Sequence, residues 1–371
     1  MRLVALGASF PNIMLKLIRF IFRINRKTPC DIDQGAISKT LITIPPLPVE
    51  IYGLIIRHIV ERSVLLKVKL VSRAFLKEAH IQLFRNITIK SSGSNRQMSF
   101  LKQLSNHSSN VFYVRSFSLW PMPPSIPRPG MTQDQDGYWV DVFGFLERVI
   151  NLIDLEIVGG GPRPEWIANE ARKDRYSGKI TFLPSLSTLS CDAMIASIIL
   201  PGRDVRRFHC SAGPALPKLD QDAALVAALK HIDILLISHQ SGYTALSSHC
   251  VNARYLEITH DVNEVGLTAP FTAFYQTNND SESQSATIEQ LARHPLISML
   301  RVMSFRSGSN EFTTTPVAKR AAETFLHNHT NLRTVYIHVE SRGTCRWTKP
   351  NVAVSEEVIV RADDWKYVRM T

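Results

Sequence analysis

A short pattern of apolar residues recurs along most of this 371-residue chain. Each copy is six residues long and has apolar side chains at its first, fourth and sixth positions. The copies are VRSFSL at 114–119, LIDLEI at 152–157, LSTLSC at 186–191, VRRFHC at 205–210, IDILLI at 232–237, ARYLEI at 253–258, LRVMSF at 300–305 and LRTVYI at 332–337. Their central apolar residues fall at 117, 155, 189, 208, 235, 256, 303 and 335, about 31 residues apart on average. The alternation that closes each copy predicts a strand.

Helix-like stretches precede several of these predicted strands. They are FGFLERVIN at 143–151, QDAALVAALKH at 221–231, ATIEQLARHP at 286–295 and PVAKRAAETFLHN at 316–328. A strand and a helix every few tens of residues are typical of stacked repeats, in which neighbouring units bury one another's apolar faces. The Pro-rich segment at 121–137 and the polar segment at 277–285 indicate loops between units.

The repeats of residues 110–345 resemble an irregular leucine-rich-repeat solenoid, with residues 346–371 as a C-terminal extension or cap. The resemblance implies an α/β fold with parallel strands on the concave face and helices outside. An ordinary α/β domain is the alternative, because the spacing is uneven and most copies lack the asparagine expected after the strand. Candidate recognition residues on the concave face are the alternates within the strands: Ser116, Ser118, Glu156, Glu257 and Thr259.

A compact, strongly apolar block precedes the repeats and opens with LPVEIYGLIIRHI at 47–59. Pro48 suits a first helical turn, and Glu50 suits the positive end of the helix dipole. Isoleucines and leucines then recur at helical spacing, and Ser63 is a candidate N-cap for the helix that follows. The apolar residues of this block are too many for about 40 residues to bury among themselves, so we expect part of them to meet a partner.

Residues 47–90 resemble an F-box, the module by which substrate receptors attach to Skp–cullin ubiquitin ligases. The resemblance rests on LPVEI at 47–51, LL at 65–66, LVSRAF at 70–75 and LFRNI at 83–87. It departs from the family at Phe75, where many F-boxes have tryptophan, and at Val64, where a capping residue is usual. By likeness to the family, the residues that bind the Skp adaptor would be Leu47, Pro48, Ile51, Ile55, Leu66, Leu70, Val71 and Phe75. The alternative is a helical bundle that only caps the repeats.

The net charge of +11 lies in the first quarter of the chain. Residues 1–90 contain 15 of the 43 Lys and Arg and five of the 32 acids, so residues 91–371 are nearly neutral. This distribution argues against a nucleic-acid partner for the repeats. The F-box family's adaptor is acidic, so the basic residues between 39 and 90 should assist its encounter.

Residues 1–27 contain six basic residues, no acid and an amphipathic pattern. They are typical of a membrane-surface helix or a mitochondrial targeting segment, and a non-functional extension is the alternative. Residues 28–46 are polar, end in Pro45–Pro46 and indicate a linker. No run of about 18 apolar residues predicts a spanning helix.

The sequence offers no convincing catalytic or metal site. GGGP at 159–162 lacks the Lys-Ser/Thr of a phosphate loop. His327 and His329, or His249 beside Cys250, lack further ligands at useful spacing. The five scattered cysteines, including Cys191 and Cys210 at core positions of their strands, favour reduced thiols in the cytoplasm or nucleus.

Two functional hypotheses follow. The first is a non-catalytic substrate adaptor of a Skp–cullin–F-box ligase, without cofactor or metal, whose repeats bind an unknown protein substrate. The second is a leucine-rich-repeat scaffold that acts at a membrane or organelle through residues 1–27, without ligase function.

Overall fold

The computed structural model describes most of the repeat region and the helical block before it. The described residues are 48–59, 61–70, 73–90, 95–106, 108–120, 135–158, 176, 179, 181–211, 222–237, 246, 249–261, 294–305, 315–339, 343–349 and 356–357. The chain divides into two compact units, Met1–Asn86 and Ile87–Thr371.

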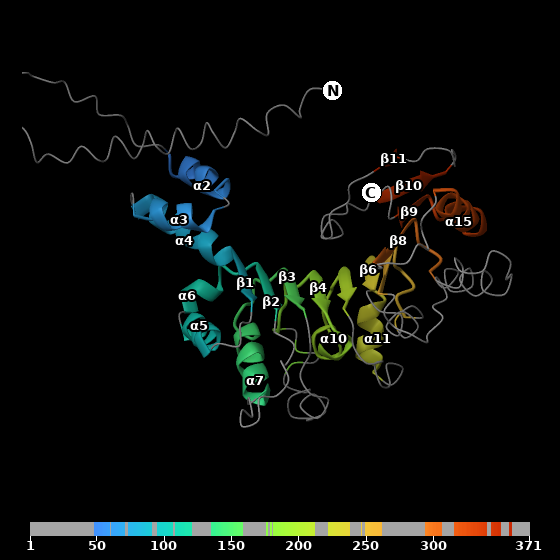
Figure 1. Ribbon diagram of the computed structural model, residues 1–371. Helices are drawn as coiled ribbons and strands as arrows, with labels where there is room; N and C mark the ends of the chain where they lie inside the picture. Colours follow the sequence, from blue (N-terminus) through green and yellow to red (C-terminus); the bar gives the residue numbers. More distant parts are fainter. Residues whose placement is uncertain are drawn as a thin grey trace, which may run out of the picture. The chain divides into compact units, whose positions relative to one another are not determined.

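The first unit contains three helices, α2 (Val49–Arg57), α3 (Arg62–Val68) and α4 (Arg73–Arg85) (Figure 1). Pro48 lies just before α2 rather than within its first turn, and its carbonyl accepts a hydrogen bond from the Ile51 N–H at 3.0 Å. Our assignment of Ser63 as an N-cap is wrong. The helix α3 begins at Arg62, because the Glu61 carbonyl already accepts hydrogen bonds from the N–H groups of Val64 and Leu65.

One small apolar core holds these three helices together. Tyr52 on α2 meets Phe75 on α4 edge to face, with ring centroids 4.7 Å apart. The buried members of the core come from all three helices and from the turn after α2: Ile55, Ile56, Ile59, Leu65, Val68, Phe75, Ala79 and Leu83. The first unit therefore has a closed core of its own.

The second unit is built on one 11-stranded sheet whose strands follow chain order (Figure 1). The strands are β1 (Asn86–Lys90), β2 (Ser116–Trp120), β3 (Asp154–Ile157), β4 (Thr188–Cys191), β5 (Arg207–Cys210), β6 (Ile234–Ile237), β7 (Tyr255–Asp261), β8 (Met299–Phe305), β9 (Thr334–Val339), β10 (Gly343–Thr348) and β11 (Glu356–Glu357). Strands β2 to β9 are parallel, and β10 and β11 are each antiparallel to the strand before. All eight predicted strands are confirmed, as is the α/β class.

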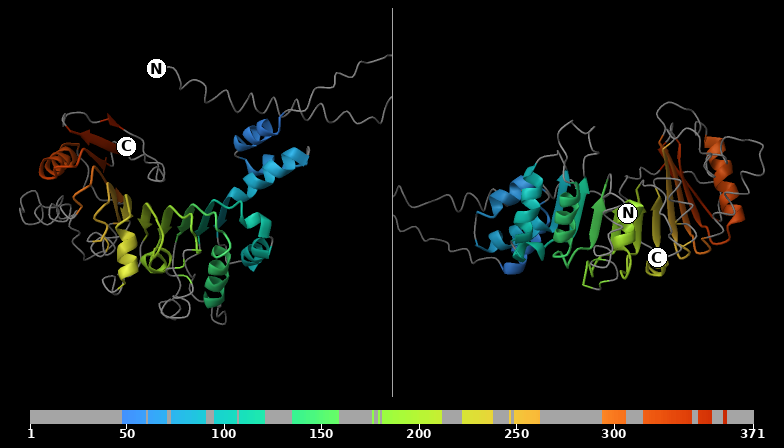
Figure 2. Two further views of the ribbon diagram at one scale, coloured as in Figure 1. Left: turned by 180° about the vertical axis from the view of Figure 1, so that it is seen from behind. Right: turned by 90° about the horizontal axis from the view of Figure 1, so that it is seen from below.

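The helices of this unit lie on the outer side of the arc that the strands follow (Figures 1 and 2). They are α5 (Asn95–Asn106), α6 (Ser108–Val111), α7 (Gln135–Leu146), α10 (Ala193–Ile199), α11 (Ala223–Leu229) and α15 (Thr315–Asn328). The helices expected at 221–231 and 316–328 are confirmed as α11 and α15. The helix expected at 143–151 begins earlier and ends at Leu146. Most of the segments 121–137 and 277–295 lies outside the described residues.

Two of these helices begin at aspartates that cap them. Asp192 accepts a hydrogen bond from the Ile195 N–H at 2.8 Å before α10, and Asp222 accepts one from the Leu225 N–H at 3.0 Å before α11. Each cap satisfies one of the N–H groups that a helix leaves unpaired at its start. Each of these two helices therefore begins at a defined residue.

An apolar ladder runs straight across the parallel strands, one residue from each. The residues that oppose one another are Phe117, Leu155, Leu189, Phe208, Leu235, Leu256, Leu300 and Val335. Every one is at most 1% exposed. Seven of the eight predicted central residues are correct, and Met303 is wrong. Leu300 occupies that place, because β8 pairs with β7 three residues earlier than the copy LRVMSF implied.

A repeated backbone pattern fixes this register. The backbone carbonyl of the residue two positions before each ladder residue accepts hydrogen bonds from two N–H groups of the next repeat. The Arg115 carbonyl, for example, accepts from Ile153 at 2.8 Å and from Asp154 at 3.0 Å. The same arrangement recurs at the carbonyls of Ile153, Ser187, Arg206, Asp233, Arg254 and Ser298. Each repeat is thus hydrogen-bonded to the next at the start of its strand.

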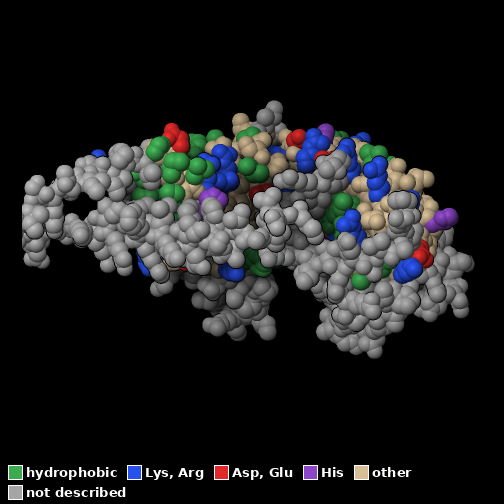
Figure 3. All heavy atoms as spheres, turned by 90° about the horizontal axis from the view of Figure 1, so that it is seen from above, with side chains coloured by type: hydrophobic (Ala, Val, Ile, Leu, Met, Phe, Trp, Pro, Cys, Tyr) green, Lys and Arg blue, Asp and Glu red, His purple; other side chains and the backbone are tan. Residues whose placement is uncertain are grey.

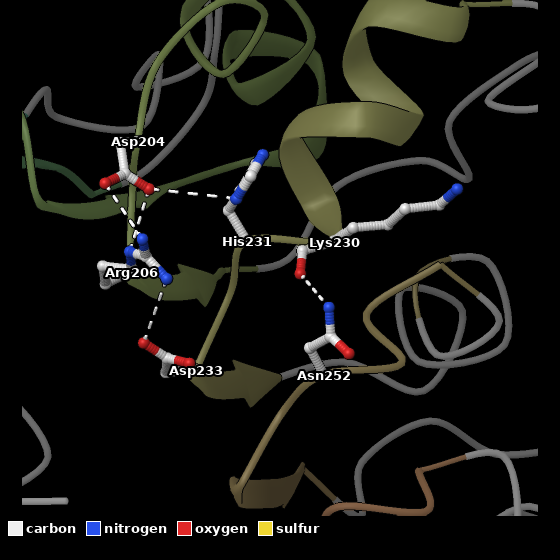
Figure 4. Close-up of polar contacts among 6 residues, drawn as sticks. All are labelled: Asp204, Arg206, Lys230, His231, Asp233 and Asn252. Atoms are coloured by element: carbon white, nitrogen blue, oxygen red, sulfur yellow. Dashed lines mark hydrogen bonds and ion pairs between the residues drawn. The ribbon is translucent and has the colours of Figure 1, made fainter.

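Asparagine side chains add hydrogen bonds between successive repeats at three places. Asn151, Asn252 and Asn331 each lie immediately before the first apolar residue of a copy. Their amide groups donate to carbonyls of the preceding unit, at Phe112 (3.0 Å), Lys230 (2.7 Å; Figure 4) and Pro295 (2.6 Å). These asparagines therefore precede their strands, rather than following them.

The ladder yields a prediction about stability. Replacing Phe208 by alanine opens a cavity among fully buried side chains and should lower the free energy of unfolding by about 3–5 kcal/mol. The exposed Ile153, beside the same ladder, gives the matched control, and Ile153→Ala should change it by less than about 0.5 kcal/mol. Urea denaturation followed by circular dichroism measures both. Equal effects would contradict the ladder as the core of this unit.

Candidate functional site

The first candidate surface is apolar and lies on the helical unit. Five large hydrophobic side chains there are exposed, from 37% for Ile51 to 80% for Leu70. We call them the apolar surface: Ile51, Leu54, Leu66, Leu70 and Leu76. The other exposed large hydrophobics of the described residues are spread between Phe112 and Leu296. Figure 3 shows apolar side chains gathered over α2 and α3.

Local sequence explains why these side chains stay outside. The helix α2 carries apolar residues around more than half of its circumference, but the bundle contacts only one side of it. Ile55, Ile56 and Ile59 enter the core, which leaves Ile51 and Leu54 facing out. The same division on α3 buries Leu65 and exposes Leu66.

The structure separates the eight residues predicted to bind the adaptor into three groups. Pro48, Ile51, Leu66 and Leu70 are exposed. Ile55 and Phe75 are buried in the core of the bundle, so we leave them out of the apolar surface. Leu47 and Val71 lie outside the described residues. Leu54 and Leu76 are exposed and were not in the predicted set.

The charges around the apolar surface are mostly basic. Exposed Lys and Arg side chains on the three helices are Arg57, Arg62, Lys67, Arg73, Lys77 and Arg85. The exposed acids in the same segment are Glu50 and Glu61. A partner with acidic side chains around an apolar groove would complement this arrangement.

The second candidate surface is the face of the sheet opposite the apolar ladder. Side chains alternate between the two faces of a strand, so the residue after each ladder position lies on this face. We call it the open face because the described helices lie on the other side of the sheet, although its residues Ser190, Leu236, Glu257 and Arg301 are at most 4% exposed. These residues form a row across the strands: Ser118, Glu156, Ser190, His209, Leu236, Glu257, Arg301 and Tyr336. Of the predicted recognition residues, Ser116, Ser118, Glu156 and Glu257 lie on this face, and the side chain of Thr259 is outside the described set.

Neighbouring members of the row bind one another across the strands. The Ser118 hydroxyl donates to the Glu156 carboxylate at 2.8 Å, and the Ser190 Oγ lies 2.9 Å from the His209 Nδ1. The Arg301 guanidinium contacts the Glu257 carboxylate at 3.2 Å. The open face therefore presents polar groups held in fixed positions.

The Glu257–Arg301 pair is buried beside an apolar cluster. Ile234, Leu236 and Tyr255 form this cluster on the open face, with Met299 packed against it. The Tyr255 hydroxyl donates to the Glu257 Oε2 at 2.7 Å, and burial together with that carboxylate raises the pKa of Tyr255. The tyrosine is therefore a neutral donor at physiological pH.

Sequence reasoning missed Arg301 for a specific reason. With Met303 taken as the central core residue, the open-face alternates of that copy would be positions 302 and 304. The true register puts Leu300 in the core and Arg301 on the open face. Pairing by the apolar pattern of Ile297, Leu300 and Val302 would have found it.

The described residues do not bring the weak metal and nucleophile candidates together. No group of three or more potential metal ligands occurs among them. His327 is exposed at the end of α15, whereas His329 is buried with its Nε2 3.1 Å from the His294 carbonyl oxygen. Cys250 is buried next to His249, and burial raises the pKa of its thiol. The GGGP segment lies outside the described residues.

A cluster of charged side chains does occur near the start of β5 and β6, but it is exposed (Figure 4). The Arg206 Nε lies 2.8 Å from Asp204, and its Nη1 lies 3.6 Å from Asp233. The His231 Nδ1 is 4.0 Å from Asp204. Solvent-exposed pairs of this kind contribute little to stability or binding, so we do not assign a site there.

The roles that the sequence predicts for the two ends of the chain stay predictions. Residues 1–27 and 28–46 lie outside the described residues, as does most of 346–371. Within the part of the chain that the structure describes, none of the helices is both long and apolar enough to cross a bilayer.

Comparison with protein-family models finds no family that matches the chain. Comparison with curated proteins finds no relative.

The buried cysteines lead to a prediction about reactivity. Burial, with a smaller contribution from Asp192, raises the pKa of Cys210 to about 12, and burial raises those of Cys191 and Cys250 as well. At about pH 8 these thiols should hold their protons and resist iodoacetamide, because the thiolate is the reactive form. Mass spectrometry of each cysteine should show labelling only after denaturation. Rapid labelling of the native protein at any of the three would contradict their assignment as core residues.

Proposed function

We propose that the chain is a substrate-recognition adaptor of a Skp–cullin–F-box ubiquitin ligase. The three helices act as the F-box that binds the Skp adaptor, and the sheet acts as an irregular leucine-rich-repeat solenoid that binds the substrate. Ubiquitin transfer is left to other subunits. The observation that carries the proposal is the apolar surface, which lies outside a bundle whose core is already closed.

The energetics of the apolar surface favour a partner. Covering a large aliphatic side chain gains about 1.5–3 kcal/mol relative to leaving it in water. Ile51, Leu54, Leu66, Leu70 and Leu76 forgo much of this gain in the isolated chain. Exposed apolar side chains concentrated in this way mark interaction sites, and here they fall within the segment that resembles an F-box.

The open sheet face supports the second half of the proposal. Parallel sheets ordinarily have helices on both faces, but the helices that the structure describes in this unit all lie on one side of the arc (Figures 1 and 2). Repeat proteins use such a face as an extended binding surface. The chain-ordered strands, the apolar ladder and the asparagine contacts between units all favour the leucine-rich-repeat assignment.

A pull-down with a purified Skp-type adaptor tests the F-box. Changing Leu66→Asp together with Leu70→Asp buries two unpaired charges at the interface, so binding should weaken at least about 100-fold. Both side chains are exposed, so the melting temperature should stay within about 2 °C of wild type.

The matched control is Ile150→Asp with Ile153→Asp, two exposed apolar residues of the second unit. This variant should bind the adaptor as wild type does. Equal binding by wild type and the Leu66/Leu70 variant, or no binding by wild type, would refute the F-box assignment.

The basic side chains around the apolar surface predict a salt-dependent encounter. Lys67→Glu with Lys77→Glu should slow association with the acidic adaptor about tenfold at low ionic strength, with a smaller effect on dissociation. Surface plasmon resonance at two salt concentrations separates the two rates. The control is Lys67→Arg with Lys77→Arg, which keeps both positive charges. An unchanged association rate in the Glu variant would contradict the electrostatic argument.

A further inference from the structure

Arg301 is a buried charged side chain whose donors are only partly used. Its Nη1 lies 3.2 Å from the Glu257 Oε2, and its side chain is 2% exposed. Its Nε and Nη2 are also buried, and neither has a hydrogen-bond partner in the part of the chain that the structure describes. Buried donors on a charged group are expensive to leave without acceptors.

A second buried arginine shows how the same fold satisfies such a group when its role is structural. The Arg203 Nε donates to the Phe182 carbonyl at 2.8 Å, and its Nη2 donates to the carbonyls of Tyr176 and Lys179, both at 2.9 Å. Its Nη1 contacts the Pro201 carbonyl. All three nitrogens of Arg203 therefore have acceptors, whereas Arg301 has one acceptor for three nitrogens.

The two unused nitrogens of Arg301 have a geometry with a specific chemical meaning. In a planar guanidinium, Nε–H and one N–H of Nη2 point to the same side and form a two-pronged donor edge. A carboxylate matches this edge with two parallel hydrogen bonds. The Glu257 carboxylate contacts Nη1, so the edge that suits a second carboxylate has no acceptor in the part of the chain that the structure describes.

The surroundings select among anions. Glu257 already places one negative charge beside the guanidinium, so a doubly charged phosphate would be repelled more than a singly charged carboxylate. Leu236, Tyr255 and Met299 next to the pair are apolar or neutral, so they suit an uncharged peptide chain on either side of the anion. Because the Arg301 side chain is 2% exposed, a ligand has to displace what covers the guanidinium, which favours a thin chain end or a short side chain over a folded surface.

We propose that the open face binds an extended peptide segment through a carboxylate that pairs with the Nε/Nη2 edge of Arg301. The inference deepens the proposed function, since it names the chemistry of the substrate that the sheet would hold. The carboxylate belongs to an Asp or Glu side chain or to the C-terminus of the substrate.

An array of immobilised octapeptides tests this on the full chain. The sequences are randomised from uncharged residues and made in four forms: amidated without an acid, amidated with a central Asp, amidated with a central phosphoserine, and with a free C-terminal carboxylate. Wild type should bind the Asp form, the free C-terminal form or both, which identifies the source. Equal binding to the uncharged form, preference for phosphoserine, or no binding to any form would overturn the proposal.

Three variants and one control assign the binding to Arg301. Arg301→Lys keeps the charge without the two-pronged edge and should weaken carboxylate binding at least about tenfold. Glu257→Gln removes the competing charge and should strengthen it. The double variant Glu257→Gln with Arg301→Met should abolish it while keeping or raising the melting temperature, because the buried pair is removed as a whole. Arg254→Gln changes an exposed arginine just before β7 and should bind as wild type does.

A structural role for Arg301 predicts the opposite pattern. The double variant would then melt at a lower temperature, and Arg301→Lys would leave peptide selectivity unchanged. All these variants should still bind the Skp-type adaptor through the apolar surface. Failure of the peptide test therefore leaves the F-box assignment standing, and failure of the adaptor test leaves the carboxylate site standing.

Discussion

The register between successive strands is the constraint on which the second unit depends. In each repeat one backbone carbonyl accepts hydrogen bonds from two N–H groups of the next repeat, and this arrangement recurs from Arg115 to Ser298. It places one fully buried apolar residue of each strand opposite the next, from Phe117 to Val335. Because side chains alternate, the same register also places the polar residues of the opposite face side by side. A slip of one residue would exchange the two faces.

The register also determines which polar groups meet on the open face. Its hydroxyl, carboxylate, imidazole and guanidinium groups come from copies tens of residues apart, yet neighbouring strands bring them within hydrogen-bond distance. Arg301 is buried, and two of its three side-chain nitrogens have no hydrogen-bond partner in the described part of the chain. Arg203 shows that the fold can satisfy a buried guanidinium completely with backbone carbonyls. This difference between the two arginines is the basis of the ligand site that we propose at Arg301.

The helical unit shows the same division between core and surface on a smaller scale. A bundle of about 40 residues has too little interior for all the apolar side chains of α2, α3 and α4. Ile55 and Phe75 close the core, while Leu66 and Leu70 stay in water. The apolar surface is thus a consequence of composition and size, and it gives the proposed adaptor its place to bind.

The sequence by itself determined the strands and the surplus of apolar residues. The six-residue pattern located all eight parallel strands, since a strand that is buried on one face must alternate. Seven of eight ladder residues followed from it. The apolar composition of residues 47–90 led separately to the expectation that the N-terminal helices have more apolar side chains than they can bury.

Only the tertiary structure decided which side chains those are and which groups meet. Ile51 and Ile55 are equivalent in sequence pattern, but only Ile55 is buried in the core of the bundle. Met303 and Leu300 are both apolar, and only hydrogen bonding to β7 selects Leu300 and thereby turns Arg301 toward Glu257. Local pattern fixes the period of a strand, but its register against a neighbour is set by contacts between residues far apart in the chain.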